Sequence, residues 1–324
     1  MKILVTGGAG YIGSHLVDRL LEAGEEVYVV DNLTTGSVEN IKHNLSNPNL
    51  RFINDSVLNE ALMERLIKEC DVIYHLAAAV GVKHIVDDPL TSIKTNVKGT
   101  DIVLDLAHRY WKKTLIASTS EIYGKSNQIP FDEHKTERVL GSTKIDRWAY
   151  STSKAIDEHL AFAYSKKGLP VVIVRYFNSY GPRIDEKGYG TVVARFIKQA
   201  LKGKPLTVHG DGKQTRCFTY VDDTVRGTIL ACTTPDAEGD VYNIGSDQET
   251  SIYQLAGLIK ELTGSSSEVV TTSYESYYGE GFEDTVRRVP SIVNAKKKLK
   301  FEAKVSLTEG LEKTIKWCKE NYTY

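Results

Sequence analysis

Tyr150 and Lys154 are four residues apart in the stretch Tyr-Ser-Thr-Ser-Lys. On a helix this spacing puts both side chains on one face. A lysine ammonium beside a phenol favours the phenolate, so we expect Lys154 to lower the pKa of Tyr150. A phenolate can accept a proton from a substrate hydroxyl. The pair therefore indicates acid–base chemistry, although the same spacing is common on helices that catalyse nothing.

A second group of reactive side chains follows the apolar run Lys113–Ser118, which is typical of a buried strand. Thr119 and Ser120 supply hydroxyls, and Glu121 supplies a carboxylate. Open α/β sheets place their chemistry at the carboxyl ends of the strands. We therefore predict that Thr119, Ser120 and Glu121 are catalytic together with the tyrosine and the lysine; the alternative is a turn that only ends a strand.

A glycine-rich motif lies between the strand-like run Lys2–Thr6 and a predicted helix over Ser14–Ala23. Gly7 permits a tight turn, Gly10 lets the backbone approach a pyrophosphate, and Gly13 lets the helix pack closely on the sheet. The free N–H groups and the dipole of the helix N-terminus stabilise phosphate. The strand, the turn and the helix together predict a dinucleotide site.

An aspartate at the end of the second strand selects between the two nicotinamide dinucleotides. Asp31 can accept a hydrogen bond from a ribose hydroxyl, and its charge would repel a 2′-phosphate, which favours NAD over NADP. Asp55 follows the run Arg51–Asn54 and is expected near the adenine, with a turn aspartate as the alternative. The predicted NAD-binding residues are Gly7, Gly10, Tyr11, Ile12, Gly13, Asp31, Asn32, Asp55, Leu76, Ala77, Ala78, Tyr150 and Lys154.

Strand-like and helical patterns alternate along the chain. Strands are predicted at Lys2–Thr6, Glu26–Val30, Val72–Leu76, Lys113–Ser118, Val171–Tyr176, Leu206–His209 and Val241–Ile244. Helices are predicted at Ser14–Ala23, Asn59–Cys70, Pro89–Tyr110, Tyr150–Lys166, Thr191–Leu201, Asp222–Cys232, Ile252–Leu262 and Leu307–Tyr322, with a turn at Gly264–Ser267. Apolar strands alternating with helices predict an α/β fold with a doubly wound parallel sheet of the Rossmann type.

The elements become shorter after Tyr176, and a loop rich in glycine and charge is expected over Asn178–Gly190. We interpret this half as a smaller C-terminal α/β domain that binds the substrate. Residues 1–177 plus 218–245 are assigned to the NAD-binding domain. Residues 178–217 plus 246–324 are assigned to the substrate-binding domain.

Composition excludes several function classes. With a net charge of −1, the chain lacks the excess positive charge that is typical of nucleic-acid-binding proteins. No apolar run approaches the ~20 residues of a membrane span. The N-terminus lacks the layout of a signal peptide. The four cysteines have neither metal-site nor disulfide spacing, and we expect no metal site. A cytoplasmic enzyme fits these observations.

Further motifs give the chain its resemblance to a known family. They are Arg175-Tyr176-Phe177-Asn178, Gly181-Pro182-Arg183, the stretch Leu206–Asp223 and Asn243-Ile244-Gly245. With the glycine motif and the tyrosine–lysine pair, the chain resembles the extended short-chain dehydrogenase/reductases that act on nucleotide sugars, the epimerase/dehydratase family. The resemblance implies that NAD oxidises C4 of a UDP-sugar, and that Asn178, Thr207, Arg216 and Arg288 bind the substrate. It also implies a homodimer joined by a four-helix bundle, with the 89–110 and 150–166 helices of each subunit at the interface.

Within this family, Thr119-Ser120-Glu121 and the stretch Gln214–Phe218 are similar to UDP-glucuronate decarboxylases. So are Arg147-Trp148, Tyr277–Asp284 and Arg288–Ile292. The similarity implies that Ser120, Glu121 and Arg288 act at C5 and C6. Arg288 could then hold a substrate carboxylate in a bidentate pair, or it could be a surface arginine beside Arg287. The loop Ala77–His84 lacks the proline of those decarboxylases and is closer to epimerases and dehydratases.

The first hypothesis is therefore a UDP-glucuronate decarboxylase, whose product is UDP-xylose or, if NADH is not used again, the 4-keto pentose. The alternative keeps the C4 oxidation but makes the enzyme a 4-epimerase, or a 4-oxidase with 5,6-dehydratase or reductase chemistry on UDP-N-acetylglucosamine-derived sugars. A third hypothesis, from another class, is an NAD-sensing regulator without catalysis. The retained Tyr150 and Lys154 argue against it.

Overall fold

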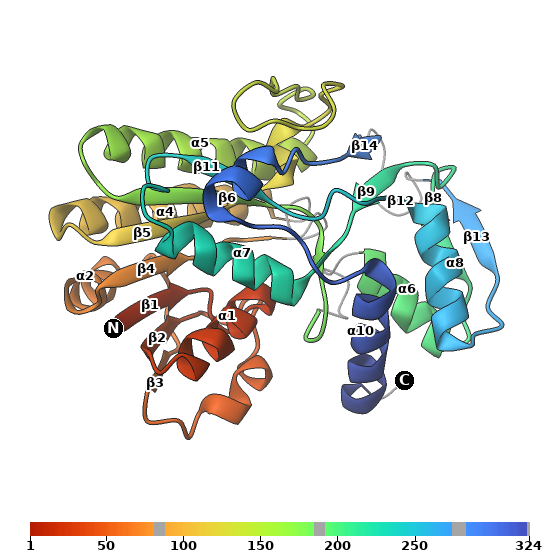
Figure 1. Cartoon of the computed structure of the whole chain (residues 1–324), viewed down its shortest axis with the longest axis horizontal. Coiled ribbons are helices and arrows are strands. Elements are labelled where there is room, and N and C mark those ends of the chain that lie inside the picture. Colours follow the sequence, from red (N-terminus) through yellow and green to blue (C-terminus); the bar gives the residue numbers. More distant parts are fainter. Residues whose placement is uncertain (81–87, 185–191, 274–282, 323–324) are drawn as a thin grey trace.

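A computed structural model describes residues 1–80, 88–184, 192–273 and 283–322. Its centre is a seven-stranded parallel sheet in the order β11-β6-β5-β4-β1-β2-β3 (Figure 1). The strands are β1 (Lys2–Thr6), β2 (Glu26–Val30), β3 (Leu50–Ile53), β4 (Val72–His75), β5 (Lys113–Thr119), β6 (Val171–Tyr176) and β11 (Val241–Ile244). The strand order reverses between β1 and β4, which is where doubly wound sheets bind dinucleotides.

Helices cover both faces of this sheet (Figure 1). One face carries α1 (Tyr11–Glu22) and α7 (Val221–Thr233), which pack against each other. The other face carries α2 (Glu60–Glu69), α4 (Pro89–Arg109) and α5 (Arg147–Lys166). Short helical turns lie at η1 (Val38–Asn40), η2 (Lys42–Asn44) and η3 (Ser120–Tyr123).

Two apolar cores, one on each face, hold these layers together. Alternate residues of one strand enter opposite cores: Ile3 and Val5 of β1 pack in the core under α1, and Leu4 packs in the core under α2 and α4. A strand buried on both faces must be apolar at every position, which is why the strand sequences read as continuous apolar runs.

Most of the remaining elements lie beyond the carboxyl ends of the strands, on the right in Figure 1. The strands are β7 (Ser179–Tyr180), β8 (Leu206–His209), β9 (Thr215–Cys217), β10 (Thr219–Tyr220), β12 (Glu249–Ser251), β13 (Val269–Thr272) and β14 (Arg287–Arg288). The helices are α6 (Val192–Leu201), α8 (Ile252–Thr263), the π-helical turn η4 (Ala295–Leu299) and α10 (Leu307–Asn321). The turn η4 packs on α7 and β11, so the chain returns to the central sheet before α10.

Every strand predicted from the sequence is confirmed, and so is the doubly wound fold. Two helices begin one turn earlier than predicted, α1 at Tyr11 and α5 at Arg147. Gly10 is the extended N-cap of α1, so the helix starts inside the glycine motif. The predicted turn after α8 is also confirmed, since Gly264 ends that helix in the left-handed conformation, φ +65°.

Parts of three predicted segments lie outside the described residues: 81–84 of the loop Ala77–His84, 185–190 of the predicted loop Asn178–Gly190, and 277–282 of Tyr277–Asp284. Thr191, the predicted first residue of α6, lies outside them too. Within the described ranges, no helix is long and apolar enough to cross a membrane.

Candidate active site

The glycine motif forms a tight turn between β1 and α1. Gly7 has a φ of +74°, and a Cβ there would lie 2.7 Å from the backbone nitrogen of Ala77. A Cβ on Gly13 would lie 2.1 Å from the carbonyl oxygen of Gly7. Gly10 caps α1 without a side-chain hydrogen bond, so the first N–H groups of the helix, those of Tyr11 and Ile12 among them, point out of the turn. This cradle of backbone fits a pyrophosphate.

Asp31 joins the end of β2 to the same turn. Its carboxylate accepts hydrogen bonds from the backbone N–H groups of Ala9 at 3.0 Å and Leu33 at 2.8 Å. Burial raises the pKa of Asp31, while these backbone donors oppose the shift. The carboxylate therefore sits at the turn, where a ribose next to the pyrophosphate would lie.

The end of β4 forms the second wall of the turn. The backbone N–H of Leu76 donates to the carbonyl of Thr6 at 3.0 Å, and that of Ala77 donates to the Thr6 hydroxyl oxygen at 3.3 Å. His75 is buried between the hydroxyls of Thr6, at 2.8 Å, and Thr100, at 3.1 Å. Burial lowers the pKa of His75 to about 3, so this ring is neutral and structural near pH 7.

Two predicted cofactor residues make local contacts. Asn32 accepts a hydrogen bond from the backbone N–H of Thr34. Asp55 accepts one from the backbone N–H of Ser56 at 2.6 Å and one from the amide of Asn59 at 2.9 Å. The turn role considered for Asp55 is therefore present, and a contact with adenine would come in addition to it.

Tyr150 and Lys154 lie on α5, as predicted, but the electrostatics differ from the prediction. The Lys154 ammonium donates to the carboxylate of Asp157 at 2.7 Å. Burial raises the pKa of Tyr150 well above its ordinary value, and the negative charges of Glu121 and Asp157 raise it further, while a hydrogen bond with Thr119 opposes the shift. The prediction that the pKa of Tyr150 is lowered is therefore wrong for the substrate-free protein, because burial and the two carboxylates outweigh the nearby ammonium.

Thr119, Ser120 and Glu121 lie together where β5 ends, as predicted. Thr119 is the N-cap of η3, and its hydroxyl accepts a hydrogen bond from the backbone N–H of Glu121 at 3.2 Å. The carbonyl oxygen of Glu121 accepts one from the hydroxyl of Ser151 on α5, at 2.8 Å. Thr119, Ser120 and Tyr150 are thus held at one edge of the sheet, since η3 packs directly on α5.

The Glu121 side chain belongs to a cluster of five charged residues, which we call the arginine cluster: Glu121, Arg147, Arg216, Asp284 and Arg288. Glu121 pairs with Arg147 at 2.6 Å and with Arg288 at 3.3 Å. Asp284 pairs with Arg216 at 2.9 Å and with Arg147 at 3.4 Å. Arg147 therefore links two carboxylates that come from distant parts of the chain.

The charges of the arginine cluster are largely withdrawn from water. Burial opposes ionisation of Glu121, but Arg147 and Arg288 lower its pKa to about 2, so it is ionised near pH 7. Burial lowers the pKa of Arg288 to about 10, and the nearby Arg216 and Arg147 act in the same direction. The Nε of Arg288 is buried and has no hydrogen-bond partner among the described residues. Three guanidiniums thus face two carboxylates, which suits a further anion.

The segment that carries Arg288 is fastened to the central sheet. In β14, Arg288 stands beside Arg216 of β9 in parallel register. The backbone of Phe131 then bonds Val289 and Ser291 on the following segment, both at 2.8 Å. The side-chain amide of Asn243 on β11 donates to the carbonyls of Phe131 and Ser291.

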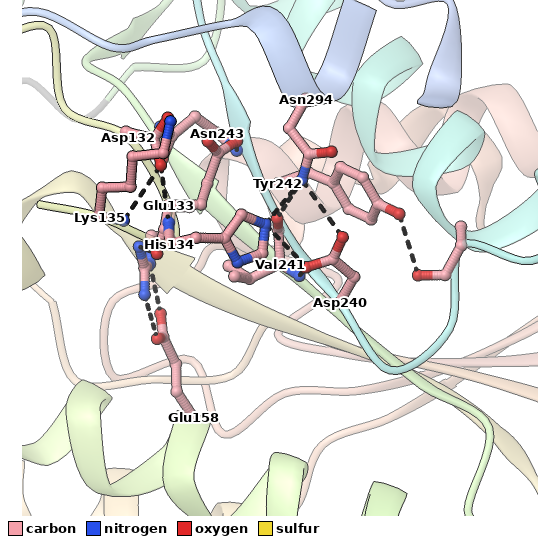
Figure 2. Close-up of polar contacts among 12 residues, drawn as sticks. Asp132, Glu133, His134, Lys135, Glu158, Asp240, Val241, Tyr242, Asn243 and Asn294 are labelled. Carbon is pink, nitrogen blue, oxygen red and sulfur yellow. Dashed lines mark hydrogen bonds and ion pairs between the residues drawn. The ribbon is translucent and has the colours of Figure 1, made fainter. Parts of the chain in front are cut away.

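Further polar contacts brace the same junction, and Figure 2 shows them gathered around β11. The backbone N–H of Asn243 donates to Glu133 at 2.8 Å, and the amide of Asn294 donates to the carbonyl of Val241 at 3.1 Å (Figure 2). This bracing fixes the position of Arg288 relative to η3 and α5.

Two predicted substrate residues lie outside the arginine cluster. The amide of Asn178, just after β6, donates to the carbonyl of Cys217 at 3.0 Å. Thr207, on β8, exchanges hydrogen bonds with the side chain of Gln199. The cluster therefore joins Glu121, Arg216 and Arg288 of the predicted residues, and Asn178 and Thr207 occupy other parts of the C-terminal elements.

Sequence reasoning assigned no role to Arg147, Asp157 or Asp284. Arg147 precedes Tyr150 by three residues, which is one helical turn, so its place on the same face could have been inferred. Asp157 follows Lys154 by three residues and carries the same signal. Asp284 ends the motif Tyr277–Asp284, but no local pattern predicts its contacts, since only the tertiary fold brings it to Arg147 and Arg216. No cluster of metal-ligating side chains occurs in the described parts of the chain.

Comparisons with known proteins agree with this geometry. Residues 3–245 match the family described as the NAD dependent epimerase/dehydratase family. The chain is 43% identical over 319 residues to a UDP-N-acetyl-alpha-D-glucosaminuronate decarboxylase of Bacillus cytotoxicus, which covers 98% of each chain. It is 42% identical to UDP-glucuronic acid decarboxylase 1 of Xenopus tropicalis, over 97% of this chain and 71% of that protein.

A solved structure of UDP-glucuronic acid 4-epimerase from Bacillus cereus, in complex with UDP-glucuronic acid and NAD, superposes with a TM-score of 0.89. It is 33% identical, and the match covers 99% of this chain and 100% of that one. The family match, the glycine cradle and the tyrosine–lysine pair together show that this chain belongs to the NAD-dependent epimerase/dehydratase family, as an NAD-using enzyme of the extended short-chain dehydrogenase/reductase type.

Proposed function

We propose that the protein is a decarboxylase of UDP-linked uronic acids, with UDP-glucuronate as its first candidate substrate. The observation that carries the proposal is the guanidinium of Arg288. This guanidinium is buried, and its Nη1 lies 3.3 Å from the Oε1 of Glu121, so the ion pair is a long one. Its Nε has no hydrogen-bond partner among the described residues. A planar guanidinium with a spare N–H donor is suited to bind a carboxylate. A neutral hexose has no carboxylate for it to bind.

The cofactor residues remain those assigned from the sequence. In this proposal Gly7, Gly10 and Gly13 hold the pyrophosphate, Asp31 a ribose and Asp55 the adenine. Tyr11, Ile12, Asn32, Leu76, Ala77 and Ala78 line the same crevice. Bound there, NAD supplies the hydride acceptor for oxidation of the sugar at C4.

The reaction follows from the residues around the sugar. Tyr150 accepts the proton of the C4 hydroxyl as hydride leaves C4, with Lys154 stabilising the phenolate. The resulting 4-ketone makes the carboxylate at C5 a β-keto acid, so the C5–C6 bond breaks and its electron pair moves into the ketone. CO₂ leaves, and C5 then takes up a proton. Thr119 and Ser120 orient the substrate, and Glu121, which is ionised before substrate binds, acts as a counter-ion to Arg147 and Arg288.

Arg216 binds the diphosphate, while Asn178 and Thr207 contact the uridine end. The division of the chain into an NAD-binding part, 1–177 plus 218–245, and a substrate-binding part, 178–217 plus 246–324, belongs to this proposal. Arg216 on β9 lies next to Arg288 on β14, so one small sheet would bind both the diphosphate and the carboxylate of the substrate.

The test is release of CO₂ from UDP-glucuronate by the purified protein supplied with NAD. UDP-glucose, which differs only in lacking the carboxylate, is the matched control and is expected to release none. Arg288→Gln should raise the KM for UDP-glucuronate by about 10-fold or more, whereas Arg287→Gln, which removes an exposed neighbour paired with Glu249, should not. Conversion of UDP-glucose or UDP-N-acetylglucosamine without any CO₂ from a uronate would contradict the proposal.

A second candidate function retains a UDP-linked uronic acid as the substrate. It differs either in the substituent at C2 of the sugar or in the reaction that follows oxidation at C4. The decarboxylase of Bacillus cytotoxicus acts on an N-acetylated uronate, and the Bacillus cereus structure is a 4-epimerase of UDP-glucuronic acid. UDP-N-acetylglucosaminuronate therefore belongs in the same assay. Product analysis by NMR distinguishes a pentose from an epimerised uronate.

We also propose a cytoplasmic homodimer formed through α4 and α5. All four cysteines are buried and free, which fits a reducing compartment. Three apolar side chains on these helices, Leu90, Ile93 and Ile156, are at least 40% exposed, as a partner helix pair would require. Light scattering at micromolar concentration should give a dimer, and Ile156→Glu should give a monomer; a wild-type monomer would refute the interface.

A further inference from the structure

Asp157 is a fully buried carboxylate for which the reaction above has no use. It lies on α5, three residues after Lys154, and its side chain is 0% exposed while that of the lysine is 2% exposed. The Lys154 ammonium donates to its Oδ2 at 2.7 Å. A charge pair so far from water is held in place by the protein around it, because each ion alone would be strongly disfavoured there.

The groups around Asp157 leave Lys154 as its main partner. Thr100 of α4 lies close to it, and its hydroxyl also bonds the buried His75 of β4, a neutral ring. Glu158, the next residue on α5, has other partners: its carboxylate accepts a hydrogen bond from the hydroxyl of Ser118 at 2.6 Å and forms an ion pair with Arg175 at 2.7 Å. Glu158 is therefore bonded to residues of the central sheet, whereas Asp157 pairs with Lys154.

We propose that Asp157 is a positioning residue that fixes the Lys154 ammonium and sets the charge balance around Tyr150. An ammonium has three donors. One of them is given to Asp157, which leaves two for a cofactor or a phenolate and fixes the direction in which they point. The proposal depends on Tyr150 and Lys154 being the acid–base pair, and not on which sugar is bound.

The electrostatics of the pair agree with this geometry. Burial raises the pKa of Tyr150, and the charges of Glu121 from η3 and Asp157 from α5 add to the shift. Burial makes the largest contribution to keeping the tyrosine protonated, and Asp157 adds to it by cancelling much of the lysine charge. The site thus keeps a neutral phenol ready, instead of a standing phenolate that would take a proton from any donor.

The experiment follows the ionisation of Tyr150 in the full-length protein saturated with NAD. The phenolate absorbance of each variant is titrated with pH, and the same variant carrying Tyr150→Phe is subtracted to isolate this tyrosine. Asp157→Asn keeps an acceptor for the ammonium and removes only the charge. It should lower the midpoint of the Tyr150 titration by about one pH unit. Asp157→Ser, a smaller uncharged variant, should do the same and serves if the asparagine variant fails to fold.

Asp223→Asn is the matched control, because Asp223 is another buried acid on a helix, paired with Arg226 and bonded to the backbone of Lys304 and Val305. It should lower stability without moving the Tyr150 midpoint. An unchanged or raised midpoint in the Asp157 variants, or an equal shift in Asp223→Asn, would overturn the inference. The titration needs no sugar, so absence of CO₂ release would refute the proposed decarboxylase and leave this result standing.

Discussion

The cofactor turn and the arginine cluster are built in opposite ways. The turn is contiguous: Gly7 to Gly13 form it, and its binding groups are backbone N–H groups. The arginine cluster is assembled from η3, α5, β9 and the segment ending in β14, and its binding groups are charged side chains.

The difference shows what each half of the site depends on. A site built from backbone N–H groups depends on free space around the backbone. Substitutions that add atoms therefore disrupt it, whereas most changes of nearby charge have little effect. A cluster of buried charges needs balance, so it is destroyed when one member is removed and the others lose their counter-ion. The same fold can therefore keep its cofactor while its substrate changes, since the charges can be exchanged without touching the turn.

Removing the central member of the cluster should have the largest effect. Arg147→Met removes the guanidinium shared by Glu121 and Asp284, which leaves each buried carboxylate with a single arginine partner, and we expect the free energy of unfolding in urea to fall by about 3–5 kcal/mol. Arg109→Met is the control, since that arginine is exposed and pairs only with Glu64 and Asp105 at the surface. Its unfolding curve should match the wild type. Equal curves for Arg147→Met and the wild type would mean that the cluster is not a balanced unit.

Adding one carbon to the turn should have the next largest effect. A Cβ at Gly13 would lie 2.1 Å from the carbonyl oxygen of Gly7, so Gly13→Ala must displace backbone. We expect NAD affinity, measured by calorimetry, to fall by about 100-fold, or roughly 3 kcal/mol. Gly257→Ala on α8 meets nothing within 4 Å and should leave affinity unchanged. Normal NAD binding by Gly13→Ala would show that the turn has more room than its geometry indicates.

This contrast also explains what the sequence could predict. The glycine turn, Asp31 beside it and the placement of Tyr150 and Lys154 on one helix follow from local patterns with known spacing, and six of the seven strands of the sheet are apolar runs, so these positions were predicted; the strand β3 was not. Arg147 and Asp284 meet only in the folded chain, 137 residues apart, and no local pattern encodes that contact. The pKa of Tyr150 was predicted in the wrong direction, because burial and the neighbouring Asp157 both act against the lysine.

Two buried groups, one from each half of the site, should lose their contributions to stability in different pH windows. Burial lowers the pKa of His75 from 6.5 to about 3, so the unfolded chain takes up its proton first, and the associated stability falls as the pH drops from 6.5 toward 3. Glu121 has its pKa lowered from 4.5 to about 2, so its contribution is lost only below 4.5.

Urea titrations between pH 6.5 and 5 measure the contribution of His75 by comparison with its variant, because the buried His209 on β8, whose pKa is lowered to about 4, acts in the same range. His75→Gln should flatten the pH dependence of the unfolding free energy by about 1.4 kcal/mol per pH unit. His159→Gln, at a position of α5 that is exposed in the single chain, is the control. If both variants keep the wild-type slope, the acid sensitivity has another source.

The smallest effect is expected where the cofactor half depends on a single side chain. Asp55 already holds Ser56 and Asn59 in the turn after β3, so a contact with adenine would add one hydrogen bond to a residue that is in place without it. Asp55→Ala should lower NAD affinity by about 10-fold at most, since one hydrogen bond contributes about 0.5–1.5 kcal/mol. Asn59→Ala, which removes the local partner of Asp55 together with the N-cap of α2, separates the two roles. If both variants bind NAD like the wild type, Asp55 caps a turn and does not contact the cofactor. In a site built from backbone, such a side chain adds to the binding without being essential to it. In the arginine cluster, by contrast, we expect the loss of any one side chain to have a larger effect.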